Sequence, residues 1–129
     1  MNKILVEVSA GELLDKLTIL EIKQEKIKDP EKLKYINDEY SVLKDQLNKN
    51  VKSDPKLDAL FNSLKKINEK LWIIEDDKRL CEKGSDFGDK FVKLSRDVHF
   101  LNDDRAKIKL EINNYTGSKI KEIKEYTKY

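Results

Sequence analysis

Arg105 is the residue whose position most strongly suggests chemistry, because it stands where a helical bundle normally places an apolar residue. Counted at about 100° per residue, it falls in the middle of an apolar helix face. The apolar members of that face are Phe87, Phe91, Leu94, Val98, Leu101, Ile108 and Ile112. Burying an isolated charge is very costly, so Arg105 must be paired or hydrogen-bonded. Only Arg79, Arg96 and Arg105 among 27 basic residues are not lysine, which suggests a need for the two-pronged guanidinium.

Further side chains that could bind a ligand fall on inward faces of the same predicted bundle. On the preceding helix they are Asn68, Trp72, Glu75 and Arg79, spaced i, i+4, i+7, i+11. Guanidinium groups bind carboxylate or phosphate, and a nearby carboxylate can serve as a general base. We therefore predict a site for a small anion inside the bundle. Its ligand-binding residues would be Asn68, Trp72, Arg79, Asn102, Arg105 and Lys109, and its catalytic carboxylates Glu21 and Glu75.

The same charges have a purely structural interpretation. Glu75 could bridge Arg79 and Arg105 as an ion network inside the bundle. Alternatively, the helix ends could leave the core, so that Glu75 and Arg79 face water. The sequence leaves these two alternatives open beside the ligand site.

Other candidate residues are weaker. Glu12 and Asp15 have the spacing of metal ligands on a helix, but carboxylates are also favoured in a first turn by the helix dipole, and we prefer that interpretation. His99 is the only histidine and is expected at the edge of the core, and Cys81 is expected to be inert. The sequence has no glycine-rich phosphate loop and no zinc-ligand spacing, so we assign no metal ligands.

The composition limits the function classes. Of the 129 residues, 40% are charged, with 27 basic and 25 acidic side chains interspersed, which argues against a nucleic-acid or membrane partner. A single cysteine fits a reducing compartment, so we expect a cytoplasmic protein. The length is that of one domain, which we place at residues 1–129.

Periodicity and capping residues predict an all-α fold, an antiparallel bundle of four main helices with a short extended N-terminus and a short C-terminal tail. Ser9 and Glu12 form the pattern of a capping box before a helix over 10–27. Asp29-Pro30 and Asp54-Pro55 open the second and third helices, the third ending near residue 82. Ser85 or Asp86 is expected to cap the fourth, which ends near residue 115.

Three segments resemble the motifs of a small bacterial helical family of unknown function. They are Gly11-Glu12-Leu13-Leu14-Asp15-Lys16-Leu17-Thr18-Ile19-Leu20-Glu21-Ile22-Lys23, Leu71-Trp72-Ile73-Ile74-Glu75-Asp76 and Asn102-Asp103-Asp104-Arg105-Ala106-Lys107-Ile108-Lys109. A second uncharacterised family shares the pattern formed here by Asn68, Leu71, Trp72, Glu75, Asp76 and Arg79. The resemblance implies a helical fold and a setting near surface-polysaccharide or glycosyltransferase genes. It implies no established activity.

The cofactor stays open, with magnesium as the one candidate. Glu12-x-x-Asp15 and Glu21-x-x-x-Glu25 only approximate the paired carboxylates with which all-α nucleotide pyrophosphohydrolases hold magnesium. The charge inventory is also similar to that of helical chorismate mutases, whose motif order is not recognisable here.

The leading hypothesis is a helical protein that binds a small phosphate- or carboxylate-bearing metabolite, as a nucleotide, nucleotide-sugar or glycan-pathway enzyme would. The alternative is a non-enzymatic interaction module whose inward charges are structural. In that case the additional apolar residues of the first helix, Ile19 and Ile22, could dock a partner or form a homodimer.

Overall fold

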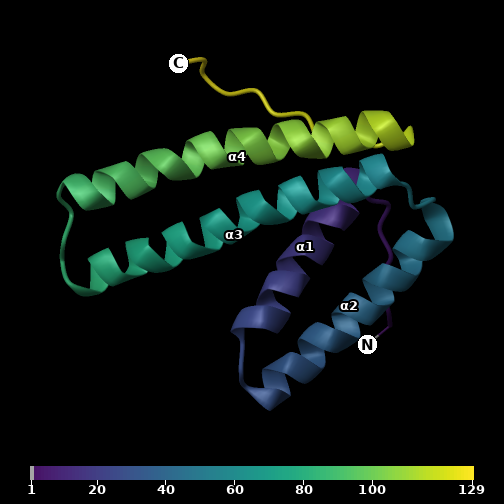
Figure 1. The fold of residues 1–129 in the computed structure, drawn as a ribbon, viewed down its shortest axis with the longest axis horizontal. Coiled ribbons are helices and arrows are strands. Elements are labelled where there is room, and N and C mark those ends of the chain that lie inside the picture. Colours follow the sequence, from purple (N-terminus) through teal and green to yellow (C-terminus); the bar gives the residue numbers. More distant parts are fainter. Residues whose placement is uncertain (1) are drawn as a thin grey trace.

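The computed structural model describes residues 2–129 and contains four α-helices (Figure 1). These are α1 (Ala10–Lys26), α2 (Pro30–Asn50), α3 (Pro55–Lys83) and α4 (Asp89–Thr116). No strand occurs among the described residues. The predicted all-α class with four main helices is confirmed.

Local capping chemistry sets most of the helix ends. The side chains of Ser9, Asp29 and Asp54 accept hydrogen bonds from backbone N–H groups in the first turns of α1, α2 and α3. Gly117 ends α4 in the left-handed conformation, at φ 71°. This conformation costs glycine no Cβ clash, which explains the stop after Thr116. The predicted boundaries of the first three helices agree with the structure to within one residue, with one exception. Residues 48–53 were expected to form a polar loop, but residues 48–50 continue α2 to Asn50.

The start of α4 differs from the prediction. Ser85 takes a left-handed φ of 51° in the turn that ends α3, and the Asp86 N–H donates to the Cys81 carbonyl oxygen at 2.8 Å. The Asp86 side chain accepts from the Gly88 N–H within the loop. Both expected caps therefore belong to the α3 exit, and Gly88 is the N-cap of α4 without a side-chain hydrogen bond.

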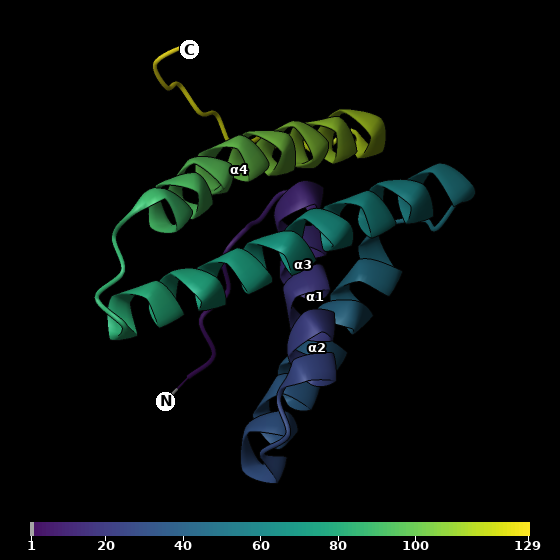
Figure 2. The same ribbon diagram turned by 60° about the vertical axis from the view of Figure 1, so that its left-hand side comes forward.

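The helices form two hairpins that cross each other. The α1–α2 hairpin lies across one half of the α3–α4 hairpin, where α1 packs against both α3 and α4 (Figures 1 and 2). A cluster of buried apolar residues joins three helices at this crossing: Leu14, Leu57, Leu64 and Ile112. The crossing places the first turns of α1 directly against the C-terminal half of α4.

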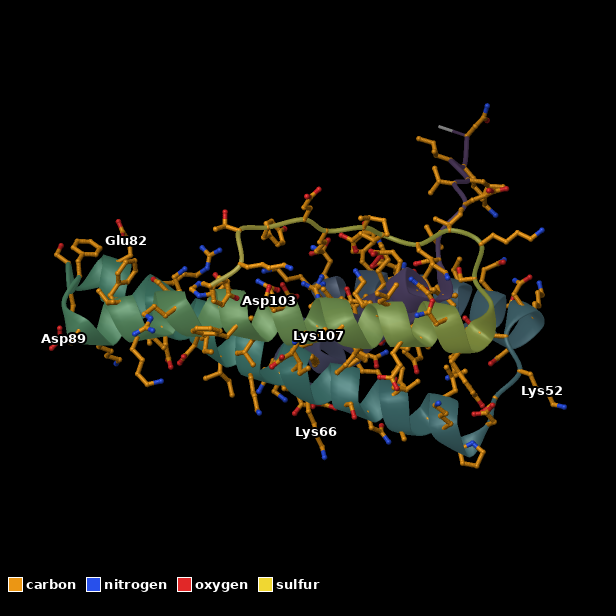
Figure 3. The ribbon with its side chains drawn as sticks, turned by 90° about the horizontal axis from the view of Figure 1, so that it is seen from above. Lys52, Lys66, Glu82, Asp89, Asp103 and Lys107 are labelled. Atoms are coloured by element: carbon orange, nitrogen blue, oxygen red, sulfur yellow. The ribbon has the colours of Figure 1, made fainter. Side chains whose placement is uncertain are left out.

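The other half of the α3–α4 hairpin projects beyond α1 and α2 in both views. We call this part the arm, comprising residues 72–83 of α3, the connecting loop 84–88 and residues 89–101 of α4. Glu82 and Asp89 lie at its tip, at the opposite end of the molecule from Lys52 (Figure 3). The predicted apolar face around Arg105 is therefore only partly buried: Ile112 is 0% exposed, but Phe87 is 52% exposed.

The two chain ends run outside the helices. Residues 2–8 are exposed and have no regular structure, because the alternating apolar side chains have no neighbouring strand to pair with. Residues 118–129 form a tail that returns along α4 (Figure 3). None of the helices within residues 2–129 combines the length and the apolar character needed to span a membrane.

Candidate functional site

The Arg105 guanidinium is bound by the Asp15 carboxylate. Arg105 Nε donates to Asp15 Oδ1 at 3.0 Å and Nη2 donates to Oδ2 at 2.5 Å. The Asp15 side chain is 2% exposed and that of Arg105 is 29% exposed. The hydrogen bonds to Asp15 raise the pKa of Arg105 against the opposing effect of burial. Arg105 is thus a permanent cation held in a fixed, two-pronged orientation.

Asn68 and Thr18 complete the surroundings of Asp15. Asn68 Nδ2 donates to Asp15 Oδ1 and to Thr18 Oγ1, both at 2.8 Å. The Thr18 hydroxyl in turn donates to the Asp15 backbone carbonyl at 2.7 Å. The buried carboxylate is therefore satisfied by donors from α3 and α4, as a buried charge requires.

Lys109 forms a second ion cluster one turn further along α4. Its amine lies 2.8 Å from Glu12 Oε2, 3.0 Å from Glu122 Oε2 and 3.7 Å from Asp15 Oδ2. Burial disfavours the charged amine, but the hydrogen bonds to Glu12 and Glu122 outweigh it and raise the pKa of Lys109. Glu12 therefore completes only half of the predicted capping box, because its side chain turns to Lys109 instead of the Ser9 backbone.

Gly11 allows α1 to come close enough for these contacts. A Cβ atom at this position would lie 2.5 Å from the Lys109 carbonyl oxygen and 2.9 Å from Asn113 Oδ1. The Gly11 N–H donates to Asn113 Oδ1 at 2.7 Å, which satisfies one of the unpaired donors at the helix start. The absence of a side chain thus sets the separation between the helices.

A cleft of about 420 Å³ opens beside the Asp15–Arg105 pair. Its lining comes from α1, α3 and α4 and consists of Ile19, Ile22, Asn68, Leu71, Trp72, Glu75, Asp76, Arg79 and Arg105. Apolar side chains thus surround a few polar groups, and the volume is in the range of small-molecule sites. The two arginines and two carboxylates of the lining balance in formal charge.

Five of the eight predicted site residues line this cleft: Asn68, Trp72, Glu75, Arg79 and Arg105. Asn102 lies next to it, since its Oδ1 is 3.5 Å from Arg105 Nη1. Lys109 is not part of the lining and belongs to the neighbouring ion cluster. Ile22 is buried and Ile19 is half-buried, so the apolar face of α1 that suggested a homodimer is largely covered within the chain.

Glu21 lies apart from the cleft. Its carboxylate accepts from the Tyr40 hydroxyl and from the Lys65 amine, each at 3.2 Å, while Lys65 also reaches Glu25 at 2.7 Å. Burial, followed by the Glu21 charge, raises the pKa of Tyr40. The hydrogen bond to Glu25 is the largest cause of the raised pKa of Lys65. These contacts tie α1 to α2 and α3.

The predicted ion network of Glu75 with Arg79 and Arg105 is not present. Within residues 2–129, neither Glu75 nor Arg79 has an ion pair, and both are exposed at the cleft. The partner of Arg105 is instead Asp15, whose place near the start of α1 suggested only a favourable interaction with the helix dipole. One pattern could have revealed it: Gly11, Asp15, Thr18 and Ile22 recur at i, i+4, i+7, i+11 and are all buried.

The remaining candidates have ordinary surroundings. His99 is exposed and contacts the rings of Phe100 and Tyr129, and Cys81 is buried. Among the residues that the structure describes, no three His, Cys, Asp or Glu side chains gather as metal ligands. Glu12 and Asp15, the pair closest to a magnesium pattern, bind Lys109 and Arg105.

Comparison with known families matches residues 4–129 to one family model. The chain belongs to DUF6165, a family of unknown function. This match covers all three motif segments and every residue of the cleft lining. No curated protein and no solved structure shows significant similarity to this DUF6165 chain. The geometry of the cleft is therefore the basis for a functional argument.

Proposed function

We propose that this DUF6165 protein binds a small phosphate- or carboxylate-bearing metabolite in the cleft. The observation that carries the proposal is the orientation of Arg105. Asp15 engages Nε and Nη2, so Nη1, whose contact to Asn102 is a long 3.5 Å, keeps donors for a ligand in the cleft. A guanidinium held in this way needs no reorganisation when an oxyanion binds.

Two other residues support the same ligand class. Arg79 is exposed in the lining and forms no ion pair with any described residue, so it is available as a second cation. The half-buried indole of Trp72 offers a face for a ring or a sugar. If the ligand is a substrate, Glu75 is the predicted catalytic carboxylate that the cleft contains. In that case we propose that the protein acts on a nucleotide, a nucleotide sugar or another metabolite of a glycan pathway.

Trp72 supplies a direct test, because it is the only tryptophan in the chain and it lines the cleft. Titration with phosphorylated metabolites, nucleotides and nucleotide sugars, with and without magnesium, should change its fluorescence. A ligand at 100 times its dissociation constant should also stabilise the native state by about 2.7 kcal/mol in a thermal-shift measurement. Flat results in both measurements across the panel would contradict the proposal.

Two exposed arginines provide matched variants. Arg79→Gln removes one proposed anion contact, and we expect the best ligand to bind roughly tenfold more weakly. Arg96→Gln removes an exposed arginine of α4 that does not line the cleft and should leave the affinity unchanged. Equal losses in the two variants would indicate general charge attraction instead of a site.

A second candidate function, pairing with another copy of the chain, is favoured by the arm. Four large apolar side chains of the arm are more than half exposed: Ile73, Leu80, Phe87 and Val92. Residues 75–77 of α3 are acidic and Lys78 and Arg79 that follow are basic. Antiparallel packing of two α3 segments about a two-fold axis would place acids opposite bases.

Sedimentation velocity over a range of concentrations tests this pairing. The protein should dimerise reversibly, and Leu80→Lys should shift it to the monomer. Val42→Lys is the matched control, because Val42 is 63% exposed on α2 and lies outside the arm. A monomer at every concentration would exclude pairing through the arm.

A further inference from the structure

The side-chain amide of Asn68 has one engaged end and one unengaged end. Nδ2 donates to Asp15 Oδ1 and Thr18 Oγ1. The hydroxyl proton of Thr18 is used toward the Asp15 carbonyl, so both partners of Asn68 act only as acceptors. This network fixes which end of the amide is nitrogen and therefore where the oxygen lies.

The oxygen of this amide has no hydrogen-bond donor among residues 2–129. Asn68 is 5% exposed, and no donor from residues 2–129 forms a hydrogen bond with its Oδ1. A fully enclosed acceptor without a partner would be costly. No fully enclosed, unpaired side-chain N or O atom occurs in the described part of the chain, so Oδ1 has access to solvent. Because Asn68 lines the cleft, the cleft provides that access.

This acceptor belongs to an amide that shares a hydrogen-bond partner with the guanidinium. Asn68 Nδ2 and Arg105 Nε donate to the same oxygen, Asp15 Oδ1, at 2.8 and 3.0 Å. The lining of the cleft thus includes a cationic donor and a neutral acceptor on two residues that both bind Asp15 Oδ1. A bare oxyanion would satisfy Arg105 but would meet the Asn68 oxygen as a second acceptor, which is unfavourable.

We infer that the cleft selects an oxyanion that carries its own proton, such as hydrogen phosphate or a monoprotonated phosphate monoester. A charged oxygen would accept from Arg105, and the P–OH group would donate to Asn68 Oδ1. This inference rests on the proposed anion site and adds a selection rule, by which the site distinguishes protonated oxyanions from fully ionised ones. Fully ionised oxyanions of the same size, with sulfate as the type case, lack the donor and bind more weakly.

Inorganic phosphate and sulfate are the probes that test this rule. An NMR titration near pH 6, at matched ionic strength, would follow the Asn68 side-chain amide and the Trp72 indole. We expect phosphate to bind about tenfold more tightly than sulfate, as one hydrogen bond of a buried polar group allows. Equal affinities would overturn the selection rule and leave the anion site intact. Absence of any shift with either ion would overturn the anion site itself, and the rule with it.

Two variants separate the contribution of Asn68 to the preference for phosphate over sulfate from the contribution of the cationic side chains to the binding of both ions. Asn68→Leu should abolish the preference for phosphate, whereas Arg79→Gln should weaken both ions and leave their ratio unchanged. Retention of the preference in folded Asn68→Leu protein would overturn the assignment to Asn68. If Asn68→Leu does not fold, the ratio measured with the unsubstituted protein decides.

Discussion

At the residue scale, the central feature is a buried carboxylate whose cationic partner is partly accessible. Replacing Arg105 by Met leaves Asp15, whose side chain is 2% exposed, without its hydrogen-bonded counter-charge and with only the Lys109 amine, 3.7 Å away, as a nearby cation. Breaking a buried pair on one side typically costs about 3–5 kcal/mol, and the partial exposure of Arg105 favours the lower end. We therefore expect Arg105→Met to lower the free energy of unfolding by about 3 kcal/mol in urea.

A double variant distinguishes charge burial from lost packing. Asp15→Leu combined with Arg105→Met removes both charges and should recover most of the stability lost in the single variant. It should not recover ligand binding, since the guanidinium is gone. A single variant as stable as the unsubstituted protein would show that the pair has no structural role.

At the scale of the helices, the close approach of α1 to α4 depends on Gly11. Gly11→Ala places a methyl group 2.5 Å from the Lys109 carbonyl, so a backbone segment must move. The gain in helix propensity is at most about 1 kcal/mol. The clash should exceed it, and we expect a net loss of about 1–3 kcal/mol in the free energy of unfolding.

Gly84→Ala is the control for this substitution. At Gly84, φ is −89° and the nearest atom to an added Cβ is 3.5 Å away, which is an ordinary contact. The free energy of unfolding of the Gly84→Ala protein should therefore differ little from that of the unsubstituted protein. The role of Gly11 would be disproved by a Gly11→Ala protein that matches this control.

The tail is held to α4 partly by the ion pair of Glu122 with Lys109. Hydrogen bonds from Lys109 and then Lys124 lower the pKa of Glu122, and the pKa of Lys109 is raised. The contact is thus complete at neutral pH, is lost in acid as pH falls through the lowered pKa of Glu122, and persists in base until Lys109 deprotonates. ¹⁵N relaxation of residues 120–129 should show release of the tail in acid.

Glu122→Gln serves as the reference for that experiment, because it should loosen the tail at neutral pH as well. Identical mobility of the tail in acid and at neutral pH, in the unsubstituted chain, would show that this ion pair does not hold it.

At the scale of the whole molecule, one half of the α3–α4 hairpin is covered by α1 and the other half is not. Local stability follows the density of buried contacts. We therefore expect native-state hydrogen exchange to be slowest around Leu64 and Ile112 and progressively faster toward the tip near Phe87. Uniform protection along both helices at low protein concentration would contradict this gradient, whereas protection that rises with concentration would support pairing through the arm.

The helices themselves were predictable from the sequence because their determinants are local. Capping residues before α1, α2 and α3, proline at the first position of two helices and Gly117 after α4 act within one turn of the chain. Helical periodicity also placed Asn68, Trp72, Glu75, Arg79 and Arg105 on inward faces. All five line the cleft, but Glu75 and Arg79 are exposed there. The start of α4 was missed because Ser85 and Asp86 suit a helix exit as well as a helix cap.

The partner of Arg105 and the extent of the core were decided by the tertiary structure. Asp15 and Arg105 are 90 residues apart, and periodicity assigns each to a face without stating which faces meet. Whether Asp15 or Glu75 pairs with Arg105 depended on where α1 crosses the hairpin. Gly11 permits that crossing because it has no Cβ atom to clash with the α4 backbone. The sequence by itself therefore determined four helices and a charge that needed a partner. Only the packing of α1 against one half of α3 and α4 determined which carboxylate that partner is, and left the cleft open beside it.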